Sequence, residues 1–198
     1  MEELSANESL SRAEIVEMLE ANGVLAGADL SGIDLAGFDF VAAAGKGPTL
    51  AGLNLADADL SESRLAGAVL AGANLAGVRL DGADLSGTTI AGANLRQASL
   101  RGVNLRGARL VGTNLGEADL RDADLRDTRW LGTNVSESDF SGARSEGARS
   151  AGMAWSSAKR PPDPLPSALI QLPEWALPAV FGLLTLLVIW FWRRRRDD

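Results

Sequence analysis

Bulky apolar residues recur at every fifth position along most of the chain. From residue 25 to residue 140, each position divisible by five is Leu, Ile, Val, Phe or Trp, except Gly45, and eighteen of these residues are Leu. Five helical steps of about 100° leave a rotation of about 140°, and five strand steps of about 180° reverse the face. Because neither a straight helix nor a straight strand can use this period, we expect the chain to turn once in every repeat.

The residues around each bulky position predict a very short strand followed by a corner. A small residue, most often Ala, lies two positions earlier, as at Ala73 and Ala93. In an extended segment, residues two apart face the same way. Glycine near the end of many repeats, as at Gly72 and Gly92, supplies the backbone torsions of a tight corner.

A second period, of twenty residues, indicates that four corners close one coil. Coils stacked about 4.8 Å apart would let side chains twenty positions apart form columns, including a ladder of asparagine amides. The asparagines with this spacing are Asn54, Asn74, Asn94, Asn114 and Asn134. The core residues that follow them are Leu55, Leu75, Leu95, Leu115 and Val135.

The repeat resembles that of the pentapeptide repeat proteins, whose pattern A(D/N)Lxx is present as ADLSG at residues 28–32 and ANLAG at residues 73–77. The resemblance spans about residues 24–155 and implies an all-β solenoid, a right-handed four-sided parallel β-helix. Two local departures carry predictions of their own. Gly45 in a core position predicts a corner that bulges into a loop, and Ser145 and Ser150 in core positions predict a frayed last coil.

A solenoid exposes raw sheet edges at both ends, and these need covers. Residues 1–23 are interpreted as an N-terminal capping segment with a helix at residues 12–21, whereas a partner-binding helix is the alternative. Ser11 and Glu14 form a capping-box pattern there. The residues predicted to face the rod are Ile15, Met18 and Leu19. At the other end, the residues predicted to cover or plug the core are Trp130, Met153 and Trp155.

Beyond the repeats, the sequence predicts a membrane anchor. Residues 156–172 are a proline-rich linker, and residues 173–192 a transmembrane helix that includes 18 residues without a charge. As a helix these 18 residues would measure about 27 Å, close to the thickness of a bilayer core. Residues 193–198 form a short charged tail. The predicted interfacial residues are Trp175, Trp190, Trp192, Arg193, Arg194, Arg195 and Arg196.

The orientation in the membrane follows from two opposing signals. The four arginines after the span favour a cytoplasmic C-terminus, which would place the repeat domain outside. Residues 1–23, however, lack the basic start, apolar core and cleavage site of an export signal. We therefore predict a single-pass tail-anchored protein of a bacterial inner (plasma) membrane with the repeat domain in the cytoplasm, and the outside placement is the alternative.

Composition argues against an enzyme, a cofactor or a metal site. The chain has no Cys, His or Tyr and hence no thiolate, no imidazole base and no soft metal ligand. A row of aspartates on one side could bind Ca²⁺, but Arg79 and Ser99 interrupt it. That row is predicted to comprise Asp39, Asp59, Asp119 and Asp139.

The distribution of charge weighs against nucleic-acid binding and DNA mimicry. The net charge is −7, but residues 24–155 carry 12 basic and 16 acidic residues and are only weakly acidic. An arginine-rich band, interleaved with carboxylates, is interpreted as a salt-bridged, solvated wall. It consists of Arg96, Arg101, Arg106, Arg109, Arg121, Arg126 and Arg129. Three pairs in this band are twenty residues apart and are expected to stack.

The sequence thus predicts a non-enzymatic, membrane-anchored scaffold or protein-interaction module. Its predicted partners are the lipid bilayer, through the C-terminal helix, and an unidentified protein. The alternative is a DNA-mimicking binder of a type II topoisomerase, because some members of the resembled family are thought to act in that way. Such a mimic would require a strongly negative surface.

Overall fold

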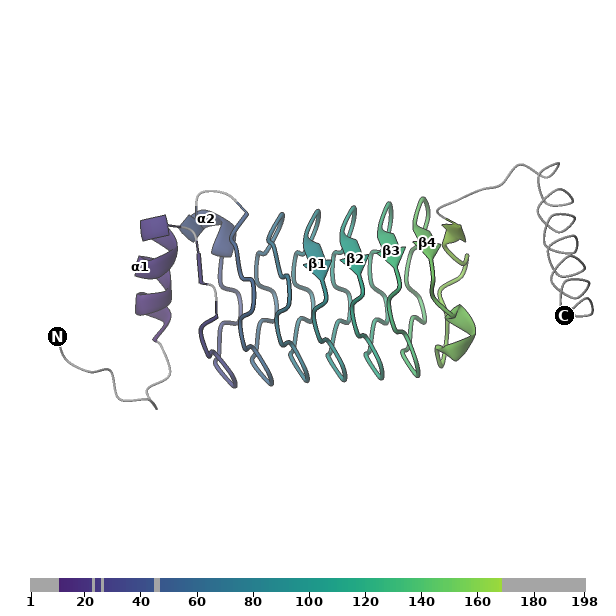
Figure 1. Cartoon of the computed structure of the whole chain (residues 1–198), viewed down its shortest axis with the longest axis horizontal. Helices are drawn as coiled ribbons and strands as arrows, with labels where there is room; N and C mark the ends of the chain where they lie inside the picture. The colour runs from purple at the N-terminus through teal and green to yellow at the C-terminus, as the bar shows by residue number, and fades with distance from the viewer. Residues whose placement is uncertain (1–10, 23, 26, 45–46, 169–198) are drawn as a thin grey trace, which may run out of the picture. The chain divides into compact units, whose positions relative to one another are not determined.

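The repeats form a rod of stacked coils, shown in Figure 1, a computed structural model that describes residues 11–22, 24–25, 27–44 and 47–168. In chain order the elements are α1 (Arg12–Asn22), α2 (Phe40–Ala44), β1 (Thr89–Ala91), β2 (Arg109–Val111), β3 (Arg129–Leu131), β4 (Arg149–Ala151), the 3-10 helix η1 (Trp155–Ser157) and β5 (Ser167–Ala168). The strands are this short because the chain turns every five residues.

The coils stack in parallel with a register of twenty residues. Strand β1 pairs with β2 so that Thr89 lies opposite Arg109, and β2 pairs with β3 so that Arg109 lies opposite Arg129. Single bridges with the same step, such as that between Asn74 and Asn94, occupy the other three sides of the coil. Four pentapeptides therefore close one coil, and the rod has four sides.

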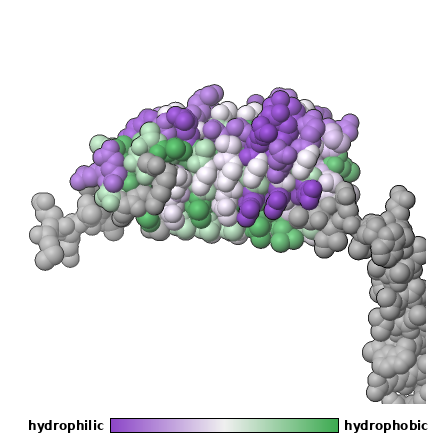
Figure 2. Space-filling view, turned by 90° about the horizontal axis from the view of Figure 1, so that it is seen from above, coloured by the Kyte–Doolittle hydropathy of each residue, from purple (hydrophilic) through white to green (hydrophobic). Residues whose placement is uncertain are grey.

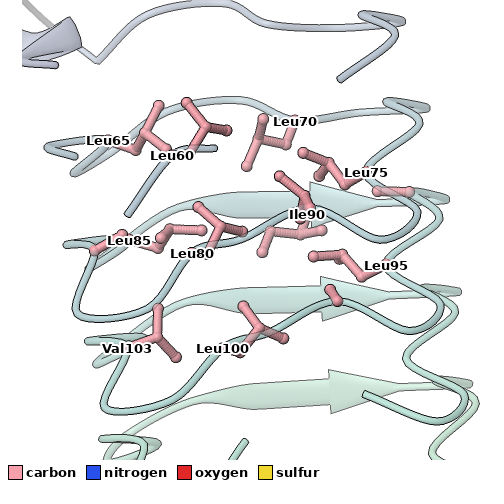
Figure 3. Close-up of a cluster of buried hydrophobic side chains, with 14 of the residues drawn as sticks. Leu60, Leu65, Leu70, Leu75, Leu80, Leu85, Ile90, Leu95, Leu100 and Val103 are labelled. Atoms are coloured by element: carbon pink, nitrogen blue, oxygen red, sulfur yellow. The ribbon is translucent and has the colours of Figure 1, made fainter. Parts of the chain in front are cut away.

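Bulky residues fill the inside of the rod. The residues at every fifth position from Leu50 to Phe140 are buried, and so are the small residues two positions before them. Figure 3 shows how they stack from coil to coil, with Leu60, Leu80 and Leu100 in one column. Each column buries apolar surface against the same column in the next coil, so packing favours the twenty-residue register.

The corners depend on a backbone conformation with positive φ. Gly82 has a φ of 67°, and Glu62, at the same corner one coil earlier, has a φ of 59°. A Cβ placed on Gly82 would lie 2.6 Å from Oε1 of Glu62, so the glutamate side chain uses the space that the glycine leaves. An L-residue other than glycine is strained in this region, and Asp57, Asp122 and Asp127 likewise extend toward the glycine of the following coil.

The first coil contains one extra pentapeptide. Val24 bridges Thr49 and Asp39 bridges Arg64, a step of twenty-five residues instead of twenty. The additional residues form α2, whose Phe40 is still buried in the core. In place of the loop expected near Gly45 there is a whole extra repeat, of which residues 40–44 form α2. The sequence predicted that Asp39 shares a side with Asp59. Because of the extra repeat, Asp39 instead pairs with Arg64 on the next side.

Helix α1 covers the N-terminal end. The backbone N–H of Ser11 donates to Glu14 Oε2 at 2.6 Å and that of Glu14 donates to Ser11 Oγ at 3.3 Å, which confirms the capping box. Ile15 and Leu19 are buried against the first coil. The prediction that Met18 faces the rod is wrong, because 37% of it is exposed.

Aromatic side chains close the C-terminal end. The rings of Trp130, Phe140 and Trp155 lie within 6.2 Å of one another in edge-to-face contacts. The last coil is not frayed: Ser145 and Ser150 are buried, and the hydroxyl of Ser145 donates to the carbonyl of Pro164.

The part of the expected linker that the structure describes also packs on the rod instead of leaving it. Arg160 bridges Asp139, and the backbone N–H of Ser167 donates to the carbonyl of Ala148 at 3.0 Å. This segment pairs with the backbone groups on the exposed edge of the last coil, and the pairing offsets the tendency of its prolines to extend away from the rod.

The predicted membrane anchor falls outside the described residues. Residues 169–198 include the whole of the predicted span, its tryptophans and its arginines. Within residues 11–22, 24–25, 27–44 and 47–168, no helix has both the length and the apolar character needed to cross a bilayer.

Candidate interaction surface

The four sides of the rod carry different side chains. The sheet side is built by β1–β5 and by the same positions in earlier coils. Its outward column comprises Thr49, Val69, Thr89, Arg109, Arg129 and Arg149. The asparagine side follows it, and the two ion-paired sides complete the coil. Their columns comprise Asp34, Asp59, Arg79, Ser99, Asp119 and Asp139 on one, and Asp39, Arg64, Asp84, Asn104, Asp124 and Arg144 on the other.

The asparagine side carries a continuous amide ladder. Nδ2 of Asn74 donates to Oδ1 of Asn54 at 2.9 Å, and the same bond joins each asparagine to the one before it up to Asn134. Each Oδ1 also accepts the backbone N–H two residues ahead, as Asn94 does from Arg96 at 3.3 Å. Because the ladder satisfies its own amides and holds the corners, it stabilises the rod and offers few free groups to a partner.

On the first ion-paired side, Asp119 binds two arginines. Its carboxylate lies 2.6 Å from Nη2 of Arg121 and 2.6 Å from Nε of Arg101. The hydrogen bonds from Arg121, together with those from Arg101, hold the pKa of Asp119 well below its usual range despite partial burial. The same contact raises the pKa of the Arg121 guanidinium. Both groups therefore stay charged and paired at neutral pH.

On the second ion-paired side, Asp124 has the same role. It lies 2.5 Å from Nη2 of Arg126 and 2.9 Å from Nη2 of Arg144, and only 12% of its side chain is exposed. Hydrogen bonds from Arg126 lower the pKa of Asp124 more than its burial raises it. Five further ion pairs neutralise arginines elsewhere on the rod: Arg64–Asp39, Arg79–Asp59, Arg96–Glu117, Arg106–Asp127 and Arg160–Asp139.

The sheet side has arginines without carboxylates. Arg109, Arg129 and Arg149 are exposed and in register, at the strand spacing of about 4.8 Å. In the part of the chain that the structure describes, none of the three side chains has an ion pair or a hydrogen bond. We call Arg109, Arg129 and Arg149 the free arginine column. It is the one place among the described residues where adjacent coils present unneutralised positive charge.

Exposed aliphatic side chains lie beside the free arginine column. Two positions after Arg109 and Arg129, Val111 and Leu131 are 42% and 48% exposed. Figure 2 shows a row of hydrophilic side chains next to a hydrophobic patch along the lower edge of the rod, toward its C-terminal half. This combination of fixed cations and apolar groups is suited to binding an anionic surface.

The described residues offer no group of acidic side chains placed to hold a metal ion. The aspartate row considered for Ca²⁺ is divided, since Asp39 lies on another side and the remaining carboxylates accept from Ser61, Ser141 or arginines. Between Leu50 and Phe140 the core is filled by buried apolar side chains. The surface can bind through charge and shape.

The comparison with protein families agrees with this geometry. The family model described as "Pentapeptide repeats (8 copies)" matches residues 24–61, 54–90, 79–116, 90–127 and 118–149, more than half of the chain. This chain belongs to the pentapeptide repeat family. Together with the parallel register, membership supports the right-handed, four-sided β-helix that the resemblance implied.

Solved pentapeptide repeat proteins resemble the chain along most of its length. Rfr23 from the cyanobacterium Cyanothece 51142 is 26% identical over 73% of this chain and 99% of that one, with a TM-score of 0.34. HetL from Nostoc sp. strain PCC 7120, involved in heterocyst differentiation regulation, is 20% identical over 80% and 100%, with a TM-score of 0.33. Full-length QnrB1, a plasmid-mediated fluoroquinolone resistance protein, is 13% identical over 81% and 99%, with a TM-score of 0.34. At these scores the likenesses say nothing about function. No curated protein matches the chain.

The sequence predicted the arginine band, but it did not predict which arginines are ion-paired and which are free. It predicted that Arg109 and Arg129 stack, as they do, and that carboxylates pair with the band, which holds for Arg96, Arg101, Arg106, Arg121 and Arg126. It missed Arg149, which continues the column, and the lack of partners for all three. The available signal was the absence of Asp and Glu at residues 49, 69 and 89, the same column in earlier coils.

Proposed function

We propose that this pentapeptide repeat protein is a non-enzymatic interaction module that residues 173–192 tether to a membrane. The rod is the working part, and its sides act through surface complementarity. In this proposal the protein is single-pass, with the repeat domain in the cytoplasm and with both a lipid bilayer and a protein as partners.

The observation that carries the proposal is the filled, register-locked rod with chemically distinct sides. Leucine columns occupy the interior, and ion pairs hold arginines and aspartates in place on two of the outer sides. Such a surface is preorganised, so a partner that binds it orders few side chains and loses little conformational entropy. An enzyme would require a concave site with convergent acid and base groups instead.

The alternative of a DNA mimic receives little support from the same surface. A mimic of the phosphate backbone needs a long run of unpaired carboxylates. Here arginines neutralise Asp119 and Asp124 on the two ion-paired sides, and the sheet side carries free arginines. We therefore do not retain topoisomerase binding as a second function.

The tether can be tested with the full chain in bacterial membranes. After washing at alkaline pH, which removes peripheral proteins, the protein is expected to stay in the membrane pellet. A matched variant with two charges in the apolar stretch, Leu183→Asp with Leu187→Asp, is expected in the supernatant. Release of the unmodified protein by the wash would contradict the tether.

The side of the membrane can be read with one added cysteine, because the chain contains none. Ser141→Cys lies on an ion-paired side. An impermeant thiol reagent is expected to label it only after the cells are lysed. Labelling in intact cells would place the rod outside and replace the cytoplasmic proposal.

The interaction role requires contacts that depend on one side of the rod. A photo-crosslinking residue at position 64, 79 or 106 is expected to trap one protein partner from one ion-paired side. Charge reversal on that side should abolish the crosslink, whereas reversal on the other side should not. Crosslinks that are equal from every side would indicate nonspecific contact and contradict the proposal.

A further inference from the structure

The sheet side lacks acidic residues along the whole rod. Its outward positions before and after each core residue, from Thr49 to Ala151, contain only Thr, Val, Ala, Leu and Arg. One of its edges is also smooth, because every corner residue there is glycine: Gly52, Gly72, Gly92, Gly112, Gly132 and Gly152. No other side of the described rod combines flatness, exposed aliphatic groups and uncompensated positive charge.

The chain leaves the rod on this same side. Strand β5 follows β4 in the sheet, and the backbone N–H of Ser167 donates to the carbonyl of Ala148 at 3.0 Å. Only residues 169–172 separate β5 from the predicted span that begins at residue 173. Fully extended, four residues reach about 14 Å. The proposed tether thus follows, along the chain, directly after the sheet that carries these arginines.

We propose that the sheet side is a membrane-contacting surface on which the rod lies against an anionic phospholipid bilayer. The free arginine column would bind lipid phosphates, and Val111 and Leu131 would enter the interfacial region. This inference rests on the proposed tether for proximity, but the chemistry of the surface is independent of it. The two ion-paired sides and the asparagine side then remain available to a protein partner.

The physical case depends on the absence of carboxylates. A guanidinium can bind phosphate oxygens through two parallel hydrogen bonds, and each basic residue near an anionic membrane adds to the attraction. On the ion-paired sides, Asp119 and Asp124 already take these bonds and cancel the charge. Exposed aliphatic groups beside the cations add apolar contact, as in amphipathic helices at membrane surfaces.

The spacing of the column also suits a lipid surface. Guanidinium groups about 4.8 Å apart on long side chains face headgroups that diffuse laterally and can adjust to them. The anionic groups of a rigid polyanion cannot adjust in this way and would have to match the spacing of the guanidinium groups from the start. A soluble polyanion is therefore a competing occupant, and the experiment includes it.

The test places a fluorescent label on opposite sides of the rod. Leu131→Cys on the sheet side and Ser141→Cys on the opposite side each carry an environment-sensitive nitrobenzoxadiazole group. Each full-length protein is reconstituted in vesicles of phosphatidylcholine, with or without phosphatidylglycerol. The label at residue 131 is expected to brighten and shift to the blue only with phosphatidylglycerol, and to revert in high salt. The label at residue 141 is expected to stay unchanged.

Two triple variants separate the free arginines from charge in general. R109Q/R129Q/R149Q should lose the response of the label at residue 131 to phosphatidylglycerol. R64Q/R101Q/R144Q removes the same number of positive charges from the ion-paired sides and should keep it. Because all six side chains are exposed, folding is checked by the urea midpoint of each variant.

Several results would overturn the proposal. A label at residue 131 that ignores phosphatidylglycerol, or two labels that respond equally, would exclude a side-specific contact. A response to duplex DNA or polyglutamate as large as that to the vesicles would identify a soluble polyanion as the occupant.

Alkaline washing of the same vesicles distinguishes a failure of the tether from a failure of the membrane-contacting side. If the protein is washed off but the label at residue 131 still responds to phosphatidylglycerol, the tether is contradicted and the membrane-contacting side is still supported. If the protein resists the wash but the label at residue 131 does not respond to phosphatidylglycerol, the tether is supported and the membrane-contacting side is contradicted.

Discussion

The sheet side and the ion-paired sides are built from the same repeat, yet their arginines have opposite fates. Arg101, Arg121 and Arg144 meet an aspartate in the same or the preceding or following coil. Arg109 lies between Thr89 and Arg129, and Arg129 lies between Arg109 and Arg149, so neither meets a carboxylate in its column. What decides between a neutral wall and a charged surface is therefore whether the same side offers a carboxylate, in the same coil or in an adjacent one, and not the number of arginines.

The comparison shows how a solenoid separates stability from recognition. Inside the rod each side has the same apolar columns, so the fold tolerates any polar residue on the outside. Outside, each column can be read as an independent linear array with one element per coil. A side can therefore acquire a binding function through substitutions that leave the register unchanged.

The largest expected effect comes from removing the interior support of the sheet side. Trp130 lies at the centre of β3, between Arg129 and Leu131, is fully buried, and its Nε1 donates to Thr128 Oγ1 at 2.7 Å. Trp130→Ala is expected to cost about 3–5 kcal/mol. Urea unfolding monitored by circular dichroism measures the loss, and a cost below that of the exposed Leu131→Ala would refute the plug.

An ion-paired side should lose stability when its shared carboxylate is neutralised. Asp124→Asn removes the charge that binds Arg126 and Arg144, and we expect a cost of about 1.5–3 kcal/mol at pH 7. Because the pKa of Asp124 is lowered in the folded protein, this contribution is complete above the unfolded pKa of about 3.9. It is lost as the pH falls below that value toward the lowered pKa.

The measurement for Asp124→Asn is the urea midpoint at several pH values. The difference from the unmodified protein should shrink between pH 5 and pH 2. R109Q/R129Q/R149Q serves as the control, because its side has no carboxylate and its difference should not change with pH in this way. A constant difference for Asp124→Asn would contradict the pairing.

The asparagine ladder is expected to have a smaller, purely structural effect. Asn94→Ala removes two ladder bonds and the bond from the Arg96 N–H, at a cost of about 1 kcal/mol. Thr89→Ala, at the equivalent position of the sheet side, makes no such bonds and should change the urea midpoint little. Equal effects of the two substitutions would show that the ladder adds no stability.

The smallest effect on folding is expected for the exposed aliphatic groups. Leu131→Ser should change the free energy of unfolding by no more than about 0.5 kcal/mol, since 48% of Leu131 is exposed. It should nevertheless weaken the phosphatidylglycerol response, read from a label at Val111→Cys. A large loss of stability would mean that Leu131 packs on the rod and is not available for contact.

Much of the rod follows from the sequence because the five-residue period is a purely local code. A Leu at each fifth position, a small residue two before it and a glycine two after it together fix the inside, the face and the corner. The twenty-residue recurrence of Asn74 and Asn94 then fixes the coil. The ends were less accessible, since β5 and the coil at residues 157–167 depend on pairing with an exposed edge that no local pattern encodes.

The interaction surface was only partly readable for the same reason. Assigning Asp39 to the wrong side shows that one inserted repeat, at α2, rotates every earlier residue by one side relative to the rest. Which arginines remain free depends on side-chain contacts between coils. The sequence contains this information only as the absence of carboxylates on the same side, two residues away or one coil away, and an absence is a weak signal.

The most direct test of the account is to give the sheet side the carboxylate that it lacks. Arg129→Asp would place an aspartate between Arg109 and Arg149, as Asp124 binds Arg144 one coil later in the same column of an ion-paired side. Arg129→Gln is the control that removes one charge without supplying a partner. The measurement is the phosphatidylglycerol response of a label at residue 111 in both variants. The account predicts that Arg129→Gln keeps most of the response and Arg129→Asp loses nearly all of it, whereas equal responses would show that the missing carboxylate is not what makes this side bind.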